Sequence, residues 1–169
     1  MDRGTIVRHP FPELIFEDSS IVILGTFPSI DSFENDFYYG HRRNLFWRLL
    51  ADIAKMPADS VEEKIELLAK MRWGLWDMVA SCSRRNSLDS SLRDIELNDI
   101  EAMLERHPSV KRLLFTGRKA QRLFEKGFGH LEIERDYLPS PSPAYAAMSY
   151  REKLRIYREK LLPDDRGGV

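Results

Sequence analysis

The sequence predicts an α/β fold in which helices cover both faces of a parallel sheet. Short apolar runs typical of buried strands alternate with segments whose apolar residues recur at helical spacing. Such alternation indicates βαβ units, whose crossover helices lie on the two faces of the sheet. The composition, 43% hydrophobic and 31% charged in 169 residues, is ordinary for one globular domain. We therefore expect a single domain over residues 1–162, followed by a polar tail over residues 163–169.

Four segments are the expected strands. The clearest covers residues 21–24 (Ile-Val-Ile-Leu), where apolar and mostly β-branched residues lie between a polar turn and Gly25. The other three cover residues 75–79, 110–115 and 133–138. Parallel sheets bind ligands in loops beyond the carboxyl ends of their strands. The loops after the first and the last strand are therefore the candidates for a functional site.

Five segments are the expected helices. Residues 44–55 carry apolar side chains at helical spacing. Capping boxes open two more, Ser60 with Glu63 for a helix to about residue 71 and Ser149 with Glu152 for a closing helix to residue 162. A cap-like start at residues 98–101 precedes a helix to residue 106, and the remaining helix follows Gly117 and runs through residue 125.

Composition excludes several classes of protein. Apolar runs such as residues 21–24 are far too short to span a membrane, and the N-terminal residues carry acids and prolines where a signal peptide is apolar. The single cysteine, Cys82, excludes an internal disulfide and a zinc site built from several cysteines. No base lies near it in sequence, so we interpret it as a buried small hydrophobic residue. We expect a cytoplasmic protein without metal or cofactor.

The charge is balanced overall and clustered locally. A net charge of −1 gives no general indication of nucleic-acid binding. Acidic residues gather in residues 59–66 and 94–105. The basic clusters lie at residues 41–43 with 48, 84–85, 118–119 with 122, and 151–160. For any one cluster, a solvated helix face is the plainer interpretation.

The loop of residues 25–44 is much longer than the about two to six residues usual between a strand and its helix, which favours a functional role. It begins with glycine, which lets the backbone approach a ligand, and it lacks the glycine patterns of nucleotide-binding loops. Its aromatic residues allow two interpretations. Phe37, Tyr38 and Tyr39 either fix the loop to the core, or one of them is a platform on which a base stacks.

The loop of residues 138–149 alternates proline with serine (Leu-Pro-Ser-Pro-Ser-Pro-Ala). Proline stiffens the backbone and leaves the serine hydroxyls and amides pointing outward. A phosphate backbone could dock on such a surface at low entropic cost. The alternative is a rigid connector that ends in a helix N-cap.

Taken together, these motifs resemble the uracil-DNA glycosylase superfamily, and most closely its hypoxanthine-DNA (deoxyinosine) glycosylase branch. The similarity runs from about residue 10 to residue 162. The stretches that carry it are Leu24-Gly-Thr-Phe-Pro-Ser29, Phe37-Tyr-Tyr-Gly-His-Arg-Arg-Asn-Leu-Phe-Trp47, Leu75-Trp-Asp-Met-Val-Ala-Ser-Cys82, Ser87-Leu-Asp-Ser90, Phe115-Thr-Gly-Arg-Lys-Ala120, Leu138-Pro-Ser-Pro-Ser-Pro-Ala144 and Ala147-Met-Ser-Tyr-Arg-Glu-Lys-Leu154.

The resemblance implies a three-layer αβα sandwich around a central four-stranded parallel sheet. It also implies that the two loops face each other over a pocket for an extruded nucleotide, with Tyr39 stacked on the base and Ala144 at the tip of the wedge that enters the base stack. The residues expected around the base are Gly25, Thr26, Phe27, Pro28, Ser29, Tyr39 and His41. Those expected to contact DNA are Ser140, Pro141, Ser142, Ala144 and Tyr145.

The expected catalytic residue is Asn44. Uracil- and thymine-specific relatives carry a catalytic asparagine where this chain has Phe27, which cannot orient water, and the hypoxanthine branch is thought to use the asparagine before Phe-Trp, here Asn44. An amide can hold water through its oxygen or donate to the departing base through its nitrogen. The plainer alternative for Asn44 is a helix N-cap.

Other side chains are candidates for acid–base chemistry. Asp77 and Asp89 lie in matching motifs and are possible bases, or else turn and cap residues. His41 could donate to the leaving base or to a phosphate.

The expected function is that of a monofunctional DNA glycosylase, a monomer without cofactor, which flips a deaminated base out of DNA and hydrolyses its glycosidic bond. Hypoxanthine is the favoured base. A uracil-directed enzyme on the same scaffold and a non-catalytic nucleic-acid binder are the alternatives.

Overall fold

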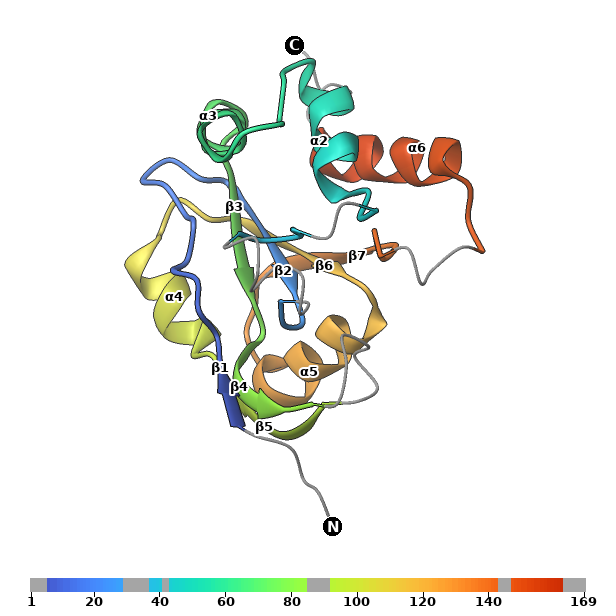
Figure 1. Ribbon diagram of the computed structural model, residues 1–169. Helices are drawn as coiled ribbons and strands as arrows, with labels where there is room; N and C mark the ends of the chain where they lie inside the picture. The colour runs from blue at the N-terminus through green and yellow to red at the C-terminus, as the bar shows by residue number, and fades with distance from the viewer. Residues whose placement is uncertain (1–5, 29–36, 41–42, 85–91, 143–146, 163–169) are drawn as a thin grey trace.

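The computed structural model of the protein describes residues 6–28, 37–40, 43–84, 92–142 and 147–162. Its centre is a parallel sheet of four strands in the order β3-β2-β6-β7 (Figure 1). These strands are β2 (Ile21–Gly25), β3 (Trp73–Asp77), β6 (Arg112–Thr116) and β7 (Glu134–Leu138). All three strand pairs are parallel, so the carboxyl ends of the four strands meet at one edge. The expected four-stranded parallel sheet is confirmed, with strand ends shifted by up to two residues.

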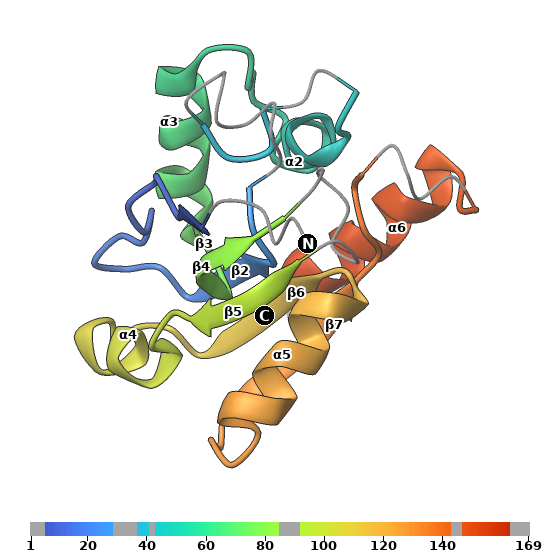
Figure 2. The ribbon, with the colours of Figure 1, turned by 60° about the horizontal axis from the view of Figure 1, so that its bottom comes forward.

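Helices cover both faces of this sheet, as Figures 1 and 2 show. On one face lie α2 (Phe46–Ala54), α3 (Val61–Met71) and α6 (Tyr150–Leu161), and on the other α4 (Ile100–Arg106) and α5 (Arg118–Phe128). The alternation of side chains along β2 explains the division, because Ile21 and Ile23 enter one core while Val22 and Leu24 enter the other. The three-layer αβα arrangement is therefore confirmed.

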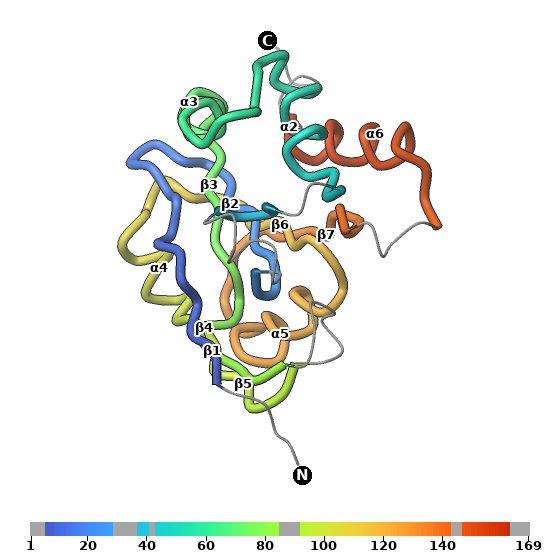
Figure 3. The backbone as a smooth tube through the Cα atoms, in the orientation of Figure 1, coloured from blue at the N-terminus to red at the C-terminus, as the bar shows by residue number. Residues whose placement is uncertain are grey.

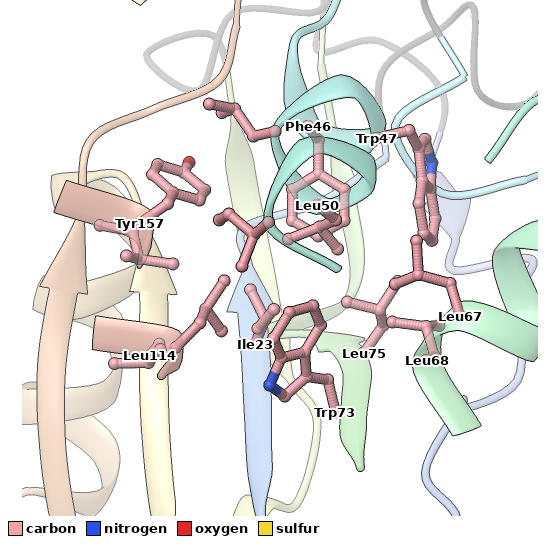
Figure 4. Packing of buried hydrophobic residues seen from close by; sticks show 14 of the residues in the cluster. Ile23, Phe46, Trp47, Leu50, Leu67, Leu68, Trp73, Leu75, Leu114 and Tyr157 are labelled. Carbon is pink, nitrogen blue, oxygen red and sulfur yellow. The ribbon is translucent and has the colours of Figure 1, made fainter. Parts of the chain in front are cut away.

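The core beneath α2, α3 and α6 is rich in large side chains (Figure 4). Phe46, Trp47 and Leu50 of α2 meet Ile23 and Leu114 of the sheet there. The remaining labelled members come from α3, β3 and α6: Leu67, Leu68, Trp73, Leu75 and Tyr157. Because α2 follows the first loop and α6 follows the last, this core holds both loops relative to the sheet.

A second, antiparallel sheet was not expected from the sequence. It contains β1 (Ile6–Arg8), β4 (Val79–Ser83) and β5 (Arg93–Leu97) in the order β1-β4-β5. The strand predicted over residues 75–79 corresponds to β3, which ends two residues earlier at Asp77, and the last predicted residue, Val79, begins β4. Backbone bonds from Met78 and Val79 to the carbonyls of Gly25 and Thr26 carry the chain from one sheet to the other.

The starts of α3 and α6 follow the expected side chains, whereas α2 begins at Phe46, two residues later than expected, and α4 is also capped later. Ser60 and Glu63 form the capping box of α3, and the Ser149 hydroxyl accepts from the Glu152 amide at the start of α6. The cap of α4 is Asp99, one residue after the asparagine expected to begin it, because Asn98 instead donates its side-chain amide to the Asp77 carbonyl. Within the described ranges, no helix is long and apolar enough to cross a membrane.

Candidate active site

Polar oxygens converge on Gly25, at the carboxyl edge of the parallel sheet. A Cβ atom built on Gly25 would lie 2.5 Å from Asp77 Oδ1, 2.9 Å from the Tyr39 hydroxyl and 3.3 Å from Thr116 Oγ1. The Tyr39 and Thr116 hydroxyls are themselves 2.9 Å apart and share a hydrogen bond. The missing side chain of Gly25 is thus what allows β3, β6 and the first loop to bring their oxygens together over β2.

Asp77 is held in place by groups that are distant in sequence. His9 Nε2 lies 2.8 Å from Asp77 Oδ2, and both side chains are 5% exposed. The Asp77 carbonyl accepts from the side-chain amide of Asn98. His9 was not found from the sequence, since nothing local marks its pairing with an aspartate on β3. Thr116 was also missed, although a polar residue that ends an apolar strand is a usable indication.

Tyr39 occupies a strained and well-supported position. Its φ of 53° lies in the left-handed region, which costs a residue with a side chain about 1–3 kcal/mol. One face of its ring stacks on Phe46, with ring centroids 3.8 Å apart and planes inclined by 13°. A base that stacks on Tyr39 must therefore use the opposite face.

The neighbouring aromatic residues fix the first loop to the core, as one interpretation of the sequence proposed. Phe37 is 8% and Tyr38 2% exposed. The Tyr38 hydroxyl donates to the Pro12 carbonyl, and Trp47 Nε1 donates to the Tyr38 carbonyl. Burial, with the nearby Asp77 charge, raises the pKa of Tyr38 far above its ordinary value of 10.0. Tyr38 is therefore a neutral anchor.

Asn44 lies at the start of α2 and is partly buried. Its Oδ1 atom accepts from the Phe46 backbone amide at 2.9 Å, so the side chain satisfies one amide of the first turn. Its side-chain nitrogen donates to no group of the described structure. The N-cap of α2 is Leu45, so Asn44 is not the N-cap residue; it lies one residue before the cap and holds the first helical amide from there, which leaves its NH2 group for a ligand.

The two loops meet directly. The Leu45 amide, next to Asn44, donates to the Pro141 carbonyl at 3.0 Å. The Tyr157 hydroxyl of α6 donates to the Pro139 carbonyl, and the Ser142 amide donates to Ser140 Oγ at 3.2 Å. The Pro-Ser loop is therefore attached on one side to α6 and on the other to the start of α2, as expected of two facing loops.

Comparison with protein families gives a clear result for this arrangement. Residues 12–164 match the model of the family described as the uracil DNA glycosylase superfamily. The chain belongs to this superfamily. The match includes both loops, all four strands of the parallel sheet and the five described helices.

Relatives in the superfamily agree over most of the chain. A protein of Methanosarcina acetivorans named hypoxanthine DNA glycosylase is 36% identical over 141 residues, which cover 82% of this chain and 89% of the relative. A protein of the same name from Methanosarcina barkeri is 35% identical over 115 residues, covering 67% and 73% of the two chains. A solution NMR structure from M. acetivorans, described as a candidate uracil DNA glycosylase, superposes with a TM-score of 0.77 at 33% identity and covers 92% of this chain and 98% of that one.

The Arg84 side chain packs against Phe27 and Pro28 at the start of the first loop. The Phe27 ring meets the His9 ring edge-on at 5.9 Å, and the Arg84 guanidinium lies 5.0 Å from the Phe27 ring centre. Arg84 also donates to the Pro28 carbonyl, and the Thr26 side chain is buried. Arg84, from one of the basic clusters, thus lies against the predicted base-binding residues.

Several of the remaining predicted residues cannot be placed, whereas Cys82 can. Ser29, His41, Asp89, Ala144 and Tyr145 lie outside the described residues, as does the tail of residues 163–169. Cys82 is fully buried, and burial raises the pKa of its thiol. It is a small core residue, as expected.

Proposed function

We propose that this chain is a monofunctional DNA glycosylase that extrudes hypoxanthine from DNA and hydrolyses its N-glycosidic bond, leaving an abasic site. Two relatives that bear the name hypoxanthine DNA glycosylase, at 36% and 35% identity, support the choice of base. The observation that carries the proposal is the position of Asn44: its oxygen is committed to the Phe46 amide, and its NH2 group is left to donate beside the junction of the two loops.

The reaction needs a donor at the departing base. Cleavage of a glycosidic bond places positive charge on the sugar, while the leaving base gains negative charge. A neutral NH2 donor stabilises that charge without any change of protonation. The Asn44 oxygen keeps a second lone pair, which can hold the attacking water. We assign stabilisation of the departing base to the Asn44 nitrogen, because the oxygen already accepts from the Phe46 amide.

The surrounding residues position the nucleotide. Tyr39, supported from behind by Phe46, offers its second face to the base. Ser140 Oγ accepts from the Ser142 amide and therefore retains its own proton to donate to a phosphate. The backbone amides of Thr26 and Phe27 are further donors in this proposal, and Ser29, His41, Ala144 and Tyr145 complete the predicted contacts. We expect the protein to act on DNA as a monomer.

The test is release of free base from duplex oligonucleotides carrying one inosine, uracil or xanthine. We expect hypoxanthine to be released fastest. The uracil arm matters because the solved structure at 33% identity is described as a candidate uracil DNA glycosylase. Faster release of uracil than of hypoxanthine would overturn the assigned substrate, and binding without release of any base would overturn the enzymatic proposal.

Two substitutions of Asn44 separate catalysis from capping. Asn44→Asp keeps an oxygen for the Phe46 amide and loses the NH2 donor, whereas Asn44→Ala loses both. We expect Asn44→Ala to lower the free energy of unfolding by about 1 kcal/mol and Asn44→Asp to change it little. Both should slow single-turnover release by at least about a hundredfold. Activity of Asn44→Asp within a few-fold of the unsubstituted protein would reduce Asn44 to a cap.

A further inference from the structure

A buried histidine–aspartate pair lies beside the proposed base site, and the mechanism above does not use it. The segment that carries His9 runs from β1 along the side of β4 and β3 before it enters β2 (Figure 3). It is fixed by a bond from the His9 amide to the Ala80 carbonyl and by the paired backbone bonds of Leu14 and Leu75. The His9 ring is enclosed by Phe11, Phe27 and Tyr38. His9 is thus a rigid group that faces Asp77.

The pair leaves one carboxylate oxygen unused. The Phe11 amide donates to His9 Nδ1, which assigns the ring hydrogen to Nε2 and makes His9 the donor to Asp77 Oδ2. Asp77 Oδ1 makes no hydrogen bond in the described structure and lies above Gly25, beside the hydroxyls of Tyr39 and Thr116. An acceptor left open at the ligand-binding edge of the sheet points to a donor on the ligand.

Deamination creates such a donor. Ring nitrogen N1 of adenine is an acceptor, whereas N1 of hypoxanthine carries a hydrogen. A carboxylate oxygen accepts from the N1–H of hypoxanthine and is repelled by the N1 lone pair of adenine. Asp77 therefore has the chemistry that separates a deaminated purine from its parent base.

Guanine also carries an N1–H, together with an adjacent 2-amino group. A carboxylate with both oxygens open would bind these two donors together, as carboxylates do with paired N–H groups. In this protein His9 occupies Oδ2, so only one oxygen remains for the base. The 2-amino group of guanine would then be left without an acceptor on entering the site, which is costly.

We propose that Asp77 reads the N1–H of hypoxanthine through Oδ1, and that His9 is a positioning residue which fixes Asp77 and excludes guanine by occupying Oδ2. The proposal rests on the proposed function for the identity of the base. It assigns His9, on the N-terminal segment, a part in substrate selection.

The experiment measures binding separately from cleavage. Oligonucleotides carry 2′-fluorinated nucleotides, whose electron-withdrawing fluorine opposes positive charge on the sugar and so slows cleavage. The bases compared are hypoxanthine and unsubstituted purine, which lacks the N1–H. We expect the unsubstituted protein to prefer hypoxanthine by about tenfold to a hundredfold, the range of a hydrogen bond to a charged group.

Asp77→Asn should abolish this preference. The new amide oxygen would accept from His9 Nε2, so that the NH2 group faces the site and opposes the N1–H of hypoxanthine. The preference is a ratio measured on one protein sample, so partial unfolding does not alter it. An unchanged preference in Asp77→Asn, with slower cleavage of every substrate alike, would overturn the proposal and make Asp77 a base for water instead.

Two substitutions of His9 test the exclusion of guanine. His9→Phe keeps an aromatic ring among Phe11, Phe27 and Tyr38 and loses the donor, whereas His9→Gln keeps a donor. We expect the preference for hypoxanthine over guanine to fall at least about tenfold in His9→Phe and to be largely restored in His9→Gln. Equal preferences in all three proteins would refute the role of His9. Selective binding of hypoxanthine without its release would instead contradict the proposed function alone.

Discussion

At the scale of single residues, the site depends on one atom that is absent. Gly25 has an ordinary φ, so its backbone does not require glycine, yet a Cβ there would lie within 3 Å of two polar oxygens. The glycine is required by the packing of Asp77, Tyr39 and Thr116 around it.

We therefore predict that Gly25→Ala lowers single-turnover base release at least about tenfold and the free energy of unfolding by about 1–3 kcal/mol, because the crowded oxygens must move. Gly127→Ala is the matched control. Its Cβ would meet only the flexible end of Leu97, at 2.9 Å, and alanine favours the helix, so activity should be unchanged and stability nearly so. Urea denaturation measures the free energy of unfolding, and release of hypoxanthine measures activity. Full activity in Gly25→Ala would contradict the crowded geometry.

The sequence was informative about some site residues and not about others. Tyr39, Asn44 and Pro141 lie in motifs whose order along the chain indicated their place. The partners that hold Asp77 and Tyr39 in place are His9 and Thr116, and both come from segments far away in sequence. Such contacts depend on the folded arrangement of strands, which no local pattern encodes.

At the scale of elements, α6 holds the Pro-Ser loop. Its Tyr157 hydroxyl donates to the Pro139 carbonyl inside the protein, and burial raises the pKa of Tyr157 well above 10.0. The hydroxyl is therefore a permanent donor. The loop that we expect to contact DNA is thus hydrogen-bonded both to α6 and to the residue that precedes α2.

Tyr157→Phe should lower the free energy of unfolding by about 1–3 kcal/mol, because a buried carbonyl loses its donor. It should also slow base release, since the loop is no longer anchored. Ser60→Ala is the comparison: it removes the exposed capping bond of α3, costs about 1 kcal/mol and should leave activity unchanged. Similar activity in the two variants at equal folded fraction would show that the anchor has no role in function.

The contact between α2 and α6 predicts a pH dependence. The Tyr150 hydroxyl donates to the Asp52 carboxylate, and burial with this bond raises the pKa of Tyr150 to about 12. A pKa raised above its ordinary value of 10.0 contributes stability that is complete below pH 10 and is lost as the pH rises towards 12. The stability difference between the unsubstituted protein and Tyr150→Phe should therefore shrink between pH 10 and pH 12. Urea denaturation at pH 8, 10 and 11 measures it, and a constant difference would refute the shift.

The parallel sheet was predictable because buried strands and capped helices leave local patterns. The antiparallel sheet was not, for three reasons. β1 has three residues, β5 (Arg-Asp-Ile-Glu-Leu) is largely polar and only partly buried, and the break at Met78 is followed directly by further apolar residues. Strands of this kind form because a partner lies beside them, and their own residues carry little preference for it.

At the scale of the whole molecule, a net charge of −1 is compatible with DNA binding because the positions of the basic residues matter more than their sum. Arg84 lies against Phe27 and Pro28, and Arg118 begins α5 directly after the carboxyl end of β6. The exposed Lys70, by contrast, is in the last turn of α3 and precedes β3, at the opposite edge of the sheet.

We predict that Arg118→Gln weakens DNA binding and reduces the slope of log affinity against log salt by about one, as expected for one lost phosphate contact. Lys70→Gln removes the same charge from the far edge and should change neither affinity nor slope beyond error. A salt titration of fluorescence anisotropy measures both. Equal effects of the two substitutions would mean that DNA responds only to total charge.

The bond between the Trp47 indole and the Tyr38 carbonyl has an optical consequence. Indole emission depends on its hydrogen bonding and packing, and this indole is attached to the residue next to Tyr39. A base that stacks on Tyr39 and shifts that backbone would change the fluorescence of Trp47 without any added label. We therefore expect Trp47, one of three tryptophans, to report nucleotide entry through the same contact that fixes the first loop.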